Sequence, residues 1–500
     1  MALTAPAPTG ADVVTRDAVC RPDASTAVPT EERAAVLHLL RRATWGVTPQ
    51  VVAEVTDVGR AAWVDGQLAP ASVPDAECEA YLARLPLASM DLVRARTGGI
   101  PQFSWDGMLA LGFATTARQL WSRRQLLEVV VDVLADHLHV ANPSGDVWWS
   151  RMDYDVTVVR RHALGRFEDA LVASAQHPAM LAFLDNASST KKAPNENYGR
   201  ELLELHTVGL GAGYTEDDVR ACTRLFTGLG IDGATGTMRF RPERHDTSAV
   251  TVLGWSAPAH AAADGPALQV SLLRYLARHP ATGRRVATKL ARRFVGDDPP
   301  AALLDRLGAL YVEKGTAIAP LVRELLLAPD ALAAAQPKVK RPREDLLSTV
   351  RAMGHRPDVS GTKGAEGIYW MLRGRADAPS DWAPPNGFPD VAAAWQSASG
   401  SLAAWDQHLE VASGWWPRAY QLATPQQLLP TPAPATVGAL VDALAQRVLA
   451  APLAPAERAA VVAFTGRTET TALRAGDEWL GWRLASLVCC VLDSPSFATR

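Results

Sequence analysis

The sequence predicts a mainly α-helical protein, with one large multi-helix domain and one small β-hairpin insertion. Apolar residues recur at helical spacing along most of the 500 residues, and many of these stretches begin at capping residues and end at glycines. Alternating and β-branched residues occur together in one region, between Gly236 and Gly254. Because no motif recurs at a fixed period, we do not expect a solenoid.

The composition is that of a folded protein with a balanced charge. Hydrophobic residues make up 48% of the chain and charged residues 21%, and 50 Lys and Arg face 53 Asp and Glu for a net charge of −3. This balance gives no basic surface for DNA or RNA, so we expect no nucleic-acid partner. No apolar run reaches the roughly 18 residues of a membrane span, so we expect no membrane partner.

The cysteines and the first residues favour a cytoplasmic protein. Five cysteines occur without CxxC spacing, which is typical of free thiols in a reducing compartment and does not favour a cysteine zinc site. The N-terminal residues lack a basic segment followed by an apolar one, the pattern of a secretory signal. The sequence is also compatible with a homo-oligomer.

We divide the chain into four segments by composition. Residues 1–28 are rich in Pro, Ala, Thr and Asp without a period, and we expect a disordered tail. Residues 29–360 form the main helical domain. Residues 361–435, rich in Trp, Pro and Gly, are expected to be an ordered loop region. Residues 436–500 are expected to be C-terminal helices packed on the main domain.

Capping residues and apolar spacing place the individual helices. The first begins at Thr30, carries Glu31 and Glu32 in its first turn, where the helix dipole favours acidic groups, and stops at Gly46. Further helices are expected over 114–137, 156–174, 195–208, 215–227, 268–278, 283–294, 300–312, 318–327, 437–449, 455–464 and 475–492.

The β-hairpin is expected where the helical spacing of apolar residues is replaced by alternating apolar and polar residues. The strand-like stretches TMRF (237–240) and AVTVLG (249–254) lie on either side of residues 242–246. Their β-branched and alternating residues predict that the two stretches pair with each other.

The segment NENYGRELLELHTVG is the densest in polar chemistry. In a helix, Asn197, Glu201 and Glu204 lie at i, i+4 and i+7 and share a face. One interpretation is a surface ladder of ion pairs, Glu196–Arg200–Glu204, worth about 0.3–0.5 kcal/mol per pair. The other is a polar face turned inward, with Asn197 and Glu201 lining a site.

Histidines next to these carboxylates point to a metal site. His206 follows Glu201 and Glu204, and His137 offers a nitrogen ligand from another helix. Mixed carboxylate and imidazole ligands suit Fe, Mn or Zn, although the Glu-x-x-His spacing of helical two-metal sites is not met. The alternative for His137 is a histidine favoured by the dipole at a helix C-terminus.

Two pairs of adjacent loop residues are further candidates for the functional site. His245-Asp246 suits an acid–base pair or metal ligands, and the alternative is a turn in which the aspartate binds its own backbone. Asp185-Asn186 follows an apolar run, where it is either a contact to substrate or a simple helix end.

Several standard motifs are absent. The sequence contains no GxxxxGK[ST], no strand-linked GxGxxG, no HExxH and no G-x-S-x-G. We therefore expect no nucleotide cofactor. The basic run from Arg284 to Arg293 is amphipathic and is interpreted as a solvated helix face.

A series of blocks runs through the chain: HLLRRATWGVTP (38–49), ADHLHV (135–140), HPAMLAFLDN (177–186), NENYGRELLELHTVGLGAGYTEDDVR (195–220), HPATGRRVATKLARRFV (279–295), KVKRP (338–342) and the turn 382–386. Their order resembles the bacterial family called domain of unknown function 1800, over about residues 30 to 400. The resemblance implies a predominantly α-helical fold. One departure is Ala135, which stands where the family pattern has a histidine.

The function hypothesis is an α-helical, metal-dependent enzyme acting on a small-molecule or peptide-like substrate. The missing export signal and the missing histidine favour a cytosolic tailoring enzyme of a biosynthetic pathway, with redox and hydrolytic chemistry both open. The candidate residues are Glu201, Glu204, His245, Asp246 and Arg200 for catalysis, Asp185, Asn186, Asn195, Asn197 and Tyr214 for substrate, and His137, Glu201 and His206 for metal.

The alternative is a non-enzymatic binding or assembly protein with tryptophan anchors. Aromatic side chains often dominate interfaces, and the plainer interpretation is that most of these tryptophans lie in the core. The residues concerned are Trp148, Trp149, Trp382, Trp395, Trp415 and Trp416.

Overall fold

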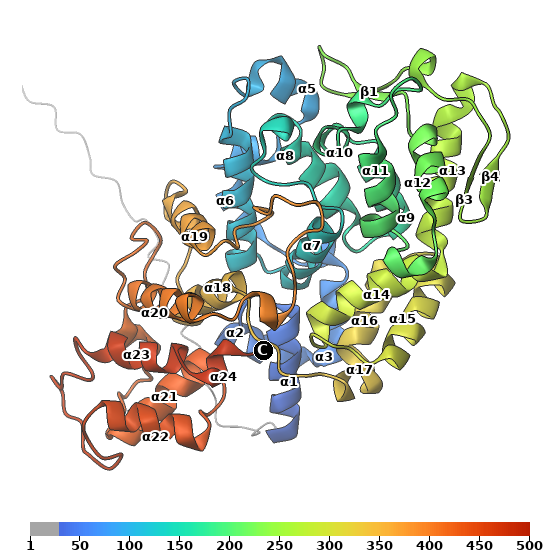
Figure 1. The fold of residues 1–500 in the computed structure, drawn as a ribbon. Helices are drawn as coiled ribbons and strands as arrows, with labels where there is room; N and C mark the ends of the chain where they lie inside the picture. Colours follow the sequence, from blue (N-terminus) through green and yellow to red (C-terminus); the bar gives the residue numbers. More distant parts are fainter. Residues whose placement is uncertain (1–29) are drawn as a thin grey trace, which may run out of the picture.

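A computed structural model of the chain describes residues 30–500, and it confirms the mainly α-helical fold (Figure 1). The predicted tail, residues 1–28, lies outside the described residues. The helices α21 and α22 lie at one end of the molecule and the strands β3 and β4 at the opposite end.

Short helices fill the first half of the fold. The predicted helix over 114–137 is two helices, because the carboxylate of Asp75 accepts hydrogen bonds from Ser122 Oγ (2.6 Å) and the Arg123 amide (2.8 Å) and fixes a break there. The helices are α1 (Thr30–Ala43), α2 (Pro49–Val58), α3 (Arg60–Gln67), α4 (Ala76–Leu82), α5 (Leu92–Arg94), α6 (Asp106–Trp121), α7 (Gln125–His137), α8 (Arg151–Tyr154), α9 (Phe167–Ala175), α10 (Pro178–Phe183), α11 (Glu196–Glu201) and α12 (Glu216–Leu225).

Two hairpins stand where one was predicted. Strand β2 (Met238–Phe240) pairs antiparallel with β1 (Leu229–Ile231), and β3 (Val250–Val252) pairs with β4 (Trp255–Ala257). The two predicted strands therefore do not pair with each other. The β3–β4 turn is Leu253-Gly254, both with positive φ (47° and 88°), the conformation that favours a two-residue hairpin. This turn could not be predicted from the sequence, because Leu rarely occupies a conformation with positive φ.

The second half is built of longer helices. The bounds predicted for α16, α21 and α22 agree with the structure, whereas α23 begins nine residues later than 475. The helices are α13 (Gly265–Arg278), α14 (Pro280–Phe294), α15 (Ala301–Glu313), α16 (Ile318–Leu327), α17 (Pro329–Ala333), α18 (Pro342–Met353), α19 (Lys363–Gly374), α20 (Ala398–Ala412), α21 (Val437–Leu449), α22 (Pro455–Phe464), α23 (Leu484–Leu492) and α24 (Pro495–Ala498).

Two helices lie within the segment that was expected to be a loop region. Helix α19 contains Gly364 and Gly367, which weaken helix propensity and hide its period. A Cβ at either position would overlap a neighbour, Asp358 or Pro417. The glycines therefore serve close packing, which sequence spacing does not show.

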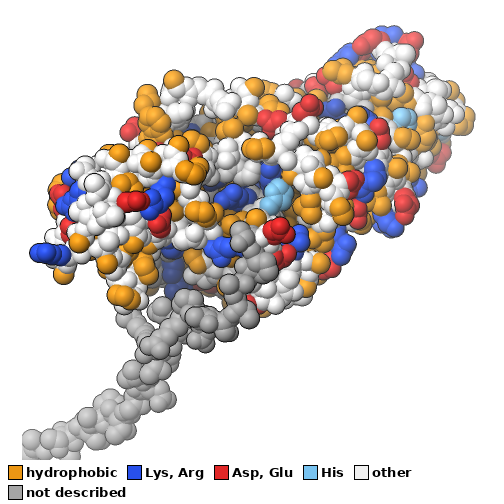
Figure 2. Space-filling model, turned by 90° about the horizontal axis from the view of Figure 1, so that it is seen from below, with side chains coloured by type: hydrophobic (Ala, Val, Ile, Leu, Met, Phe, Trp, Pro, Cys, Tyr) orange, Lys and Arg blue, Asp and Glu red, His pale blue; other side chains and the backbone are white. Residues whose placement is uncertain are grey.

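One apolar core runs through the whole fold. Buried side chains from Val36 to Phe497 form a continuous cluster, so the C-terminal helices share their core with the rest. Figure 2 shows basic and acidic side chains interspersed over one face of the molecule. None of the helices within residues 30–500 is long and apolar enough to cross a bilayer.

A buried histidine ties three helices together near the C-terminal end. His408 of α20 lies between the carboxylates of Asp493 (Nδ1 to Oδ1, 2.7 Å) and Asp345 of α18 (Nε2 to Oδ1, 3.3 Å). Burial alone would lower the pKa of His408, but the two carboxylates raise it to about 9. The imidazolium therefore donates to both partners at neutral pH.

We expect His408→Gln to destabilise the protein by about 3 kcal/mol at pH 6 and by much less at pH 9.5. Because the folded-state pKa is raised, this stability is fully present below pH 6.5 and is lost as the pH rises through 9. Urea unfolding of both proteins at each pH measures it. His355→Gln is the control, since its lowered pKa keeps His355 neutral throughout; equal losses for His408→Gln at the two pH values would contradict the assignment.

Candidate functional site: a cationic cavity beside helix α11

Four of the predicted substrate residues form a local scaffold where α10 meets α11. Asn195 caps α11 by accepting from the Asn197 amide (3.0 Å), and its Nδ2 donates to the Asp185 carbonyl (3.4 Å). Asn197 Nδ2 donates to the Leu184 carbonyl (3.3 Å), and the buried Asn186 donates to the Phe226 carbonyl (3.2 Å). These amides bind backbone, which fixes the start of α11.

The predicted ion ladder forms only in part. Arg200 makes a two-pronged pair with Glu216 (2.9 and 2.8 Å) and a longer contact with Glu196 (3.5 Å). Glu201 and Glu204 are half-buried and stand outside this ladder. Burial and then the neighbouring charge of Glu204 raise the pKa of Glu201.

The predicted histidines are buried and neutral. His137 ends α7, and its Nε2 donates to the backbone carbonyl of His206 (3.0 Å). Burial, with Arg285 and Lys289 nearby, lowers the pKa of His137 far below its usual value and that of His206 to about 3. His206 keeps a buried Nε2 without a hydrogen-bond partner. Within residues 30–500, no three His, Cys, Asp or Glu are grouped as a metal ion requires.

His245 and Asp246 face different partners. His245 Nδ1 donates to the Thr227 carbonyl (3.0 Å), and its Nε2 lies 3.0 Å from His260 Nε2. Asp246 accepts from the amide (2.9 Å) and hydroxyl of Ser248, the self-capping turn that was the alternative interpretation. The structure therefore shows no hydrogen bond between His245 and Asp246 side chains.

A cavity of about 290 Å³ lies along α14, and we call it the cationic cavity. Its walls come from α7, α14, the start of α18, Trp45 and the loop over residues 382–390, segments far apart in the sequence. The residues that line it are Trp45, Asp132, Val133, Asp136, Arg285, Lys289, Arg292, Arg293, Arg341, Glu344, Trp382, Asn386, Gly387, Phe388, Pro389 and Asp390. Basic groups outnumber the carboxylates among them.

The loop over 382–390 closes against the end of α7. Gly387 has a positive φ of 69°, and a Cβ at this position would overlap the Asp136 carbonyl. Trp382 Nε1 donates to Asn386 Oδ1 (2.9 Å), which braces the loop, and His139 Nε2 donates to the Trp382 carbonyl (2.7 Å). Glycine is therefore needed for the loop to reach the helix.

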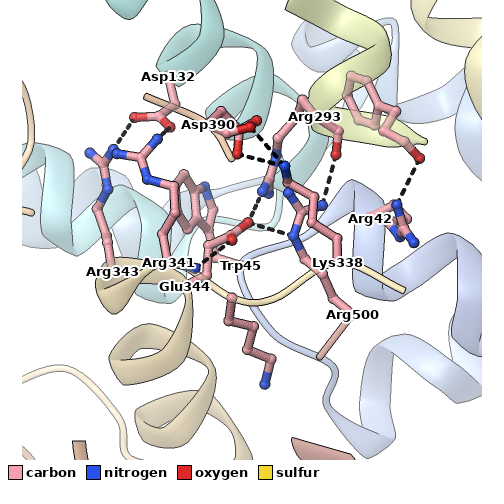
Figure 3. A network of polar contacts seen from close by, with 12 residues as sticks. Arg42, Trp45, Asp132, Arg293, Lys338, Arg341, Arg343, Glu344, Asp390 and Arg500 are labelled. Carbon is pink, nitrogen blue, oxygen red and sulfur yellow. Dashed lines mark hydrogen bonds and ion pairs between the residues drawn. The ribbon is translucent and has the colours of Figure 1, made fainter. Parts of the chain in front are cut away.

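A buried ion-pair network supports the cavity from beneath (Figure 3). Arg293 of α14 and Arg500 (Nε, 2.8 Å) both bind Glu344 Oε1. Arg343 contacts Asp132 (2.8 Å). The guanidinium carbons of Arg293 and Arg343 each lie 5.3 Å from the Trp45 ring centroid, a distance that permits cation–π attraction.

The start of α18 places two members of this network. Pro342 occupies the first turn, and Glu344 accepts from the Arg341 amide (3.0 Å), the reciprocal contact typical of a helix start. Arg341 then reaches Asp377 (2.6 Å) and Asp136 (3.5 Å). Local capping thus aims both side chains into the interior.

Three cations of α14 face the cavity without a carboxylate partner. Arg285, Lys289 and Arg292 lie at i, i+4 and i+7 on one face. Among the described residues, no carboxylate lies within ion-pair distance of any of them. Arg285 Nε is held by the Leu205 carbonyl (2.9 Å), so the segment bearing His206 contacts the cavity wall.

Two titratable groups in the cavity have pKa values near neutrality. Burial, and then the charge of Asp132, raises the pKa of Asp136 to about 7. Burial, with Arg285 and Arg292, lowers the pKa of Lys289 to about 8 despite the opposing carboxylate of Asp136. Perturbed pairs of this kind in a cavity are typical of functional sites.

The prediction of a solvated face for the basic run on α14 is confirmed for Arg284 and Arg292 and is wrong for Arg293. Arg293 is 4% exposed and Lys289 is partly buried, whereas Arg284 and Arg292 are exposed. The partners of Arg293 come from residues 45, 344 and 500, so spacing along α14 does not reveal them. The i, i+4, i+7 spacing of three cations was the available signal.

The fold and the site define a large α-helical protein with a buried ion-pair network and a cationic cavity. The sequence model of the family described as "Protein of unknown function (DUF1800)" matches residues 38–499. The chain belongs to this family, which confirms the resemblance seen in the sequence blocks. No curated protein and no solved structure matches the chain.

We expect Glu344→Gln to destabilise the protein by about 3–5 kcal/mol, because the buried guanidinium groups of Arg293 and Arg500 lose their shared counter-charge. Urea unfolding at pH 7 measures the loss. Glu324→Gln is the matched control: it breaks a half-buried pair with Arg306 (2.9 Å), an arginine that keeps Asp330 as a second partner, and is expected to cost less than about 1 kcal/mol. Similar costs for the two variants would overturn this view of the network.

Proposed function

We propose that this protein is an enzyme that binds a small anionic molecule in the cationic cavity and exchanges protons with it through Asp136 and Lys289. The observation that carries the proposal is the row of cations without a carboxylate partner, Arg285, Lys289 and Arg292, on the wall of the cavity. Arg285 and Lys289 are half-buried and Arg292 is exposed. Like charges on one helix face repel one another, and an anionic ligand offsets that repulsion.

The cavity also offers apolar walls for the rest of the ligand. Trp45, Trp382 and Phe388 line it beside the charged groups, and small-molecule sites typically combine such walls with a few placed polar groups. An acid and a base with pKa values of about 7 and 8 are matched to proton transfer at neutral pH. Hydrolytic reactions and redox tailoring reactions both use proton transfers of this kind.

In this proposal, the site residues predicted from the sequence border the cationic cavity. Arg285 links the cavity to the Leu205 carbonyl, and the negative charge of Glu204 acts on Arg285. We therefore propose that Glu201, Glu204 and Tyr214 orient the cavity wall. We also propose a cytoplasmic location, since Cys78 and Cys222 are buried free thiols.

The non-enzymatic alternative has one observation in its favour. Trp148 and Trp149 are buried and Trp382 lines the cavity, but Trp415 and Trp416 are 57% and 51% exposed. Exposed tryptophans are suited to anchoring a partner. Absence of anion binding would favour this second function.

We expect isothermal titration at low salt to detect binding of succinate or inorganic phosphate. Lys289→Met and Arg292→Gln are each expected to weaken binding by about tenfold, since each removes one charged contact. Arg284→Gln is the control, because Arg284 lies on the same helix and pairs with Asp305 at the surface. The proposal fails if the wild type binds neither anion, or if the control weakens binding equally.

The metal-dependent form of the proposal assigns His137, Glu201 and His206 as ligands. It requires near-stoichiometric Fe, Mn or Zn in protein purified without a metal-binding tag, measured by mass spectrometry. His206→Ala is expected to lose most of that metal, whereas His355→Ala, a buried histidine bound to the Val411 carbonyl, should retain it. A wild-type protein that stays metal-free after reconstitution would refute this form.

A further inference from the structure

We infer that Lys289 is a nucleophile that forms an imine with a small oxo acid, whose carboxylate is held by Arg285 and Arg292. The inference rests on the proposed function and adds the substrate class and the type of covalent chemistry. It explains why a lysine, and not a third arginine, stands between the two guanidinium groups.

The geometry around Lys289 leaves its amine available. Its side chain lines the cationic cavity, and none of the hydrogen bonds or ion pairs among residues 30–500 occupies its Nζ. Lys338, by contrast, is bound to Asp297 (2.6 Å) and Asp390 (3.0 Å). Lys289 therefore differs from a structural lysine of the same region.

Neighbouring cations keep the amine nucleophilic. Arg285 and Arg292 stand one turn before and after Lys289 on the same face of α14, and Asp136 and Asp390 oppose them from α7 and the loop. Burial beside cations lowers the pKa of Lys289 to about 8, so a useful fraction of the amine is neutral at physiological pH. Enzymes that form imines use this arrangement.

The same cavity holds a group that moves the protons of the reaction. The neutral amine attacks the carbonyl carbon, and one of its protons passes to the carbonyl oxygen, which becomes the hydroxyl of a carbinolamine. Asp136, whose carboxyl group lines the same cavity, relays protons between nitrogen and oxygen. The nitrogen lone pair then forms the C=N bond as the C–O bond breaks, and the hydroxyl leaves as water with the second nitrogen proton.

The pKa of Lys340 is also lowered, to about 7, and this lysine provides a comparison. Its Nζ binds Ser348 Oγ (2.9 Å) and lies 3.4 Å from the Phe497 ring centroid. One cavity that it lines holds about 40 Å³, and the other is a groove in which Asp345 and Asp493 offer negative charge. Neither suits an oxo acid as well as the cationic cavity does.

The test is reductive trapping on the full-length protein with pyruvate and sodium cyanoborohydride, followed by peptide mass spectrometry. We expect a reduced adduct on Lys289, suppressed by excess succinate and formed at least about tenfold faster than with acetone, which lacks the carboxylate. Lys340→Met should retain the adduct.

Two readouts on the wild-type protein separate this inference from the proposed function. Titration measures succinate binding and reductive trapping measures the adduct, and Lys289→Met is expected to form no adduct. Wild-type protein that binds succinate yet gives no adduct, or gives it equally on other lysines, would overturn the imine and leave the proposed function standing. Wild-type protein that binds neither succinate nor phosphate would overturn both.

Discussion

Glu344 is the counter-charge on which the interior of this molecule depends. Its carboxylate receives Arg293 from α14 and Arg500 from the end of the described chain, and it also caps α18. A single side chain therefore joins three parts of the fold that share no local sequence. Two buried guanidinium groups would otherwise be left without compensation, which is among the most costly defects a core can carry.

The network explains how a cavity rich in positive charge can exist beside a hydrophobic core. The buried cations Arg42, Lys338 and Arg343 each have a carboxylate or a carbonyl partner, whereas Arg285, Lys289 and Arg292 on the cavity wall have no carboxylate partner among the described residues. The paired charges fix the positions of α7, α14 and α18. The unpaired ones are held on that rigid frame and are free to meet a ligand.

Much of the fold follows from the sequence, because helical periodicity is a local property. The apolar spacing located most helices of the main domain and gave the bounds of α16 and α21, the latter capped by Thr436. The misplaced features depend on distant partners: Asp75 breaks the helix at Ser122, and close packing at Gly367 conceals α19.

In the candidate site too, local patterns could be predicted from the sequence and contacts between distant residues could not. Asn195 and Asn197 were predicted to contact substrate, and in the structure Asn195 accepts from a backbone amide and Asn197 donates to a backbone carbonyl. Arg293 and Glu344 could not be paired from sequence, because 51 residues separate them and no spacing rule connects α14 with α18. The spacing of the three cations on α14 can be recognised in the sequence. Only the structure shows which side of that helix faces a cavity.

Gly387 fixes how closely the loop over 382–390 approaches α7. Because a side chain at this position would overlap the Asp136 carbonyl, the loop can approach α7 this closely only with hydrogen in place of a methyl group. Substitution there would act as a wedge that lifts the loop from the helix end. One missing carbon atom thus holds one wall of the cavity in place.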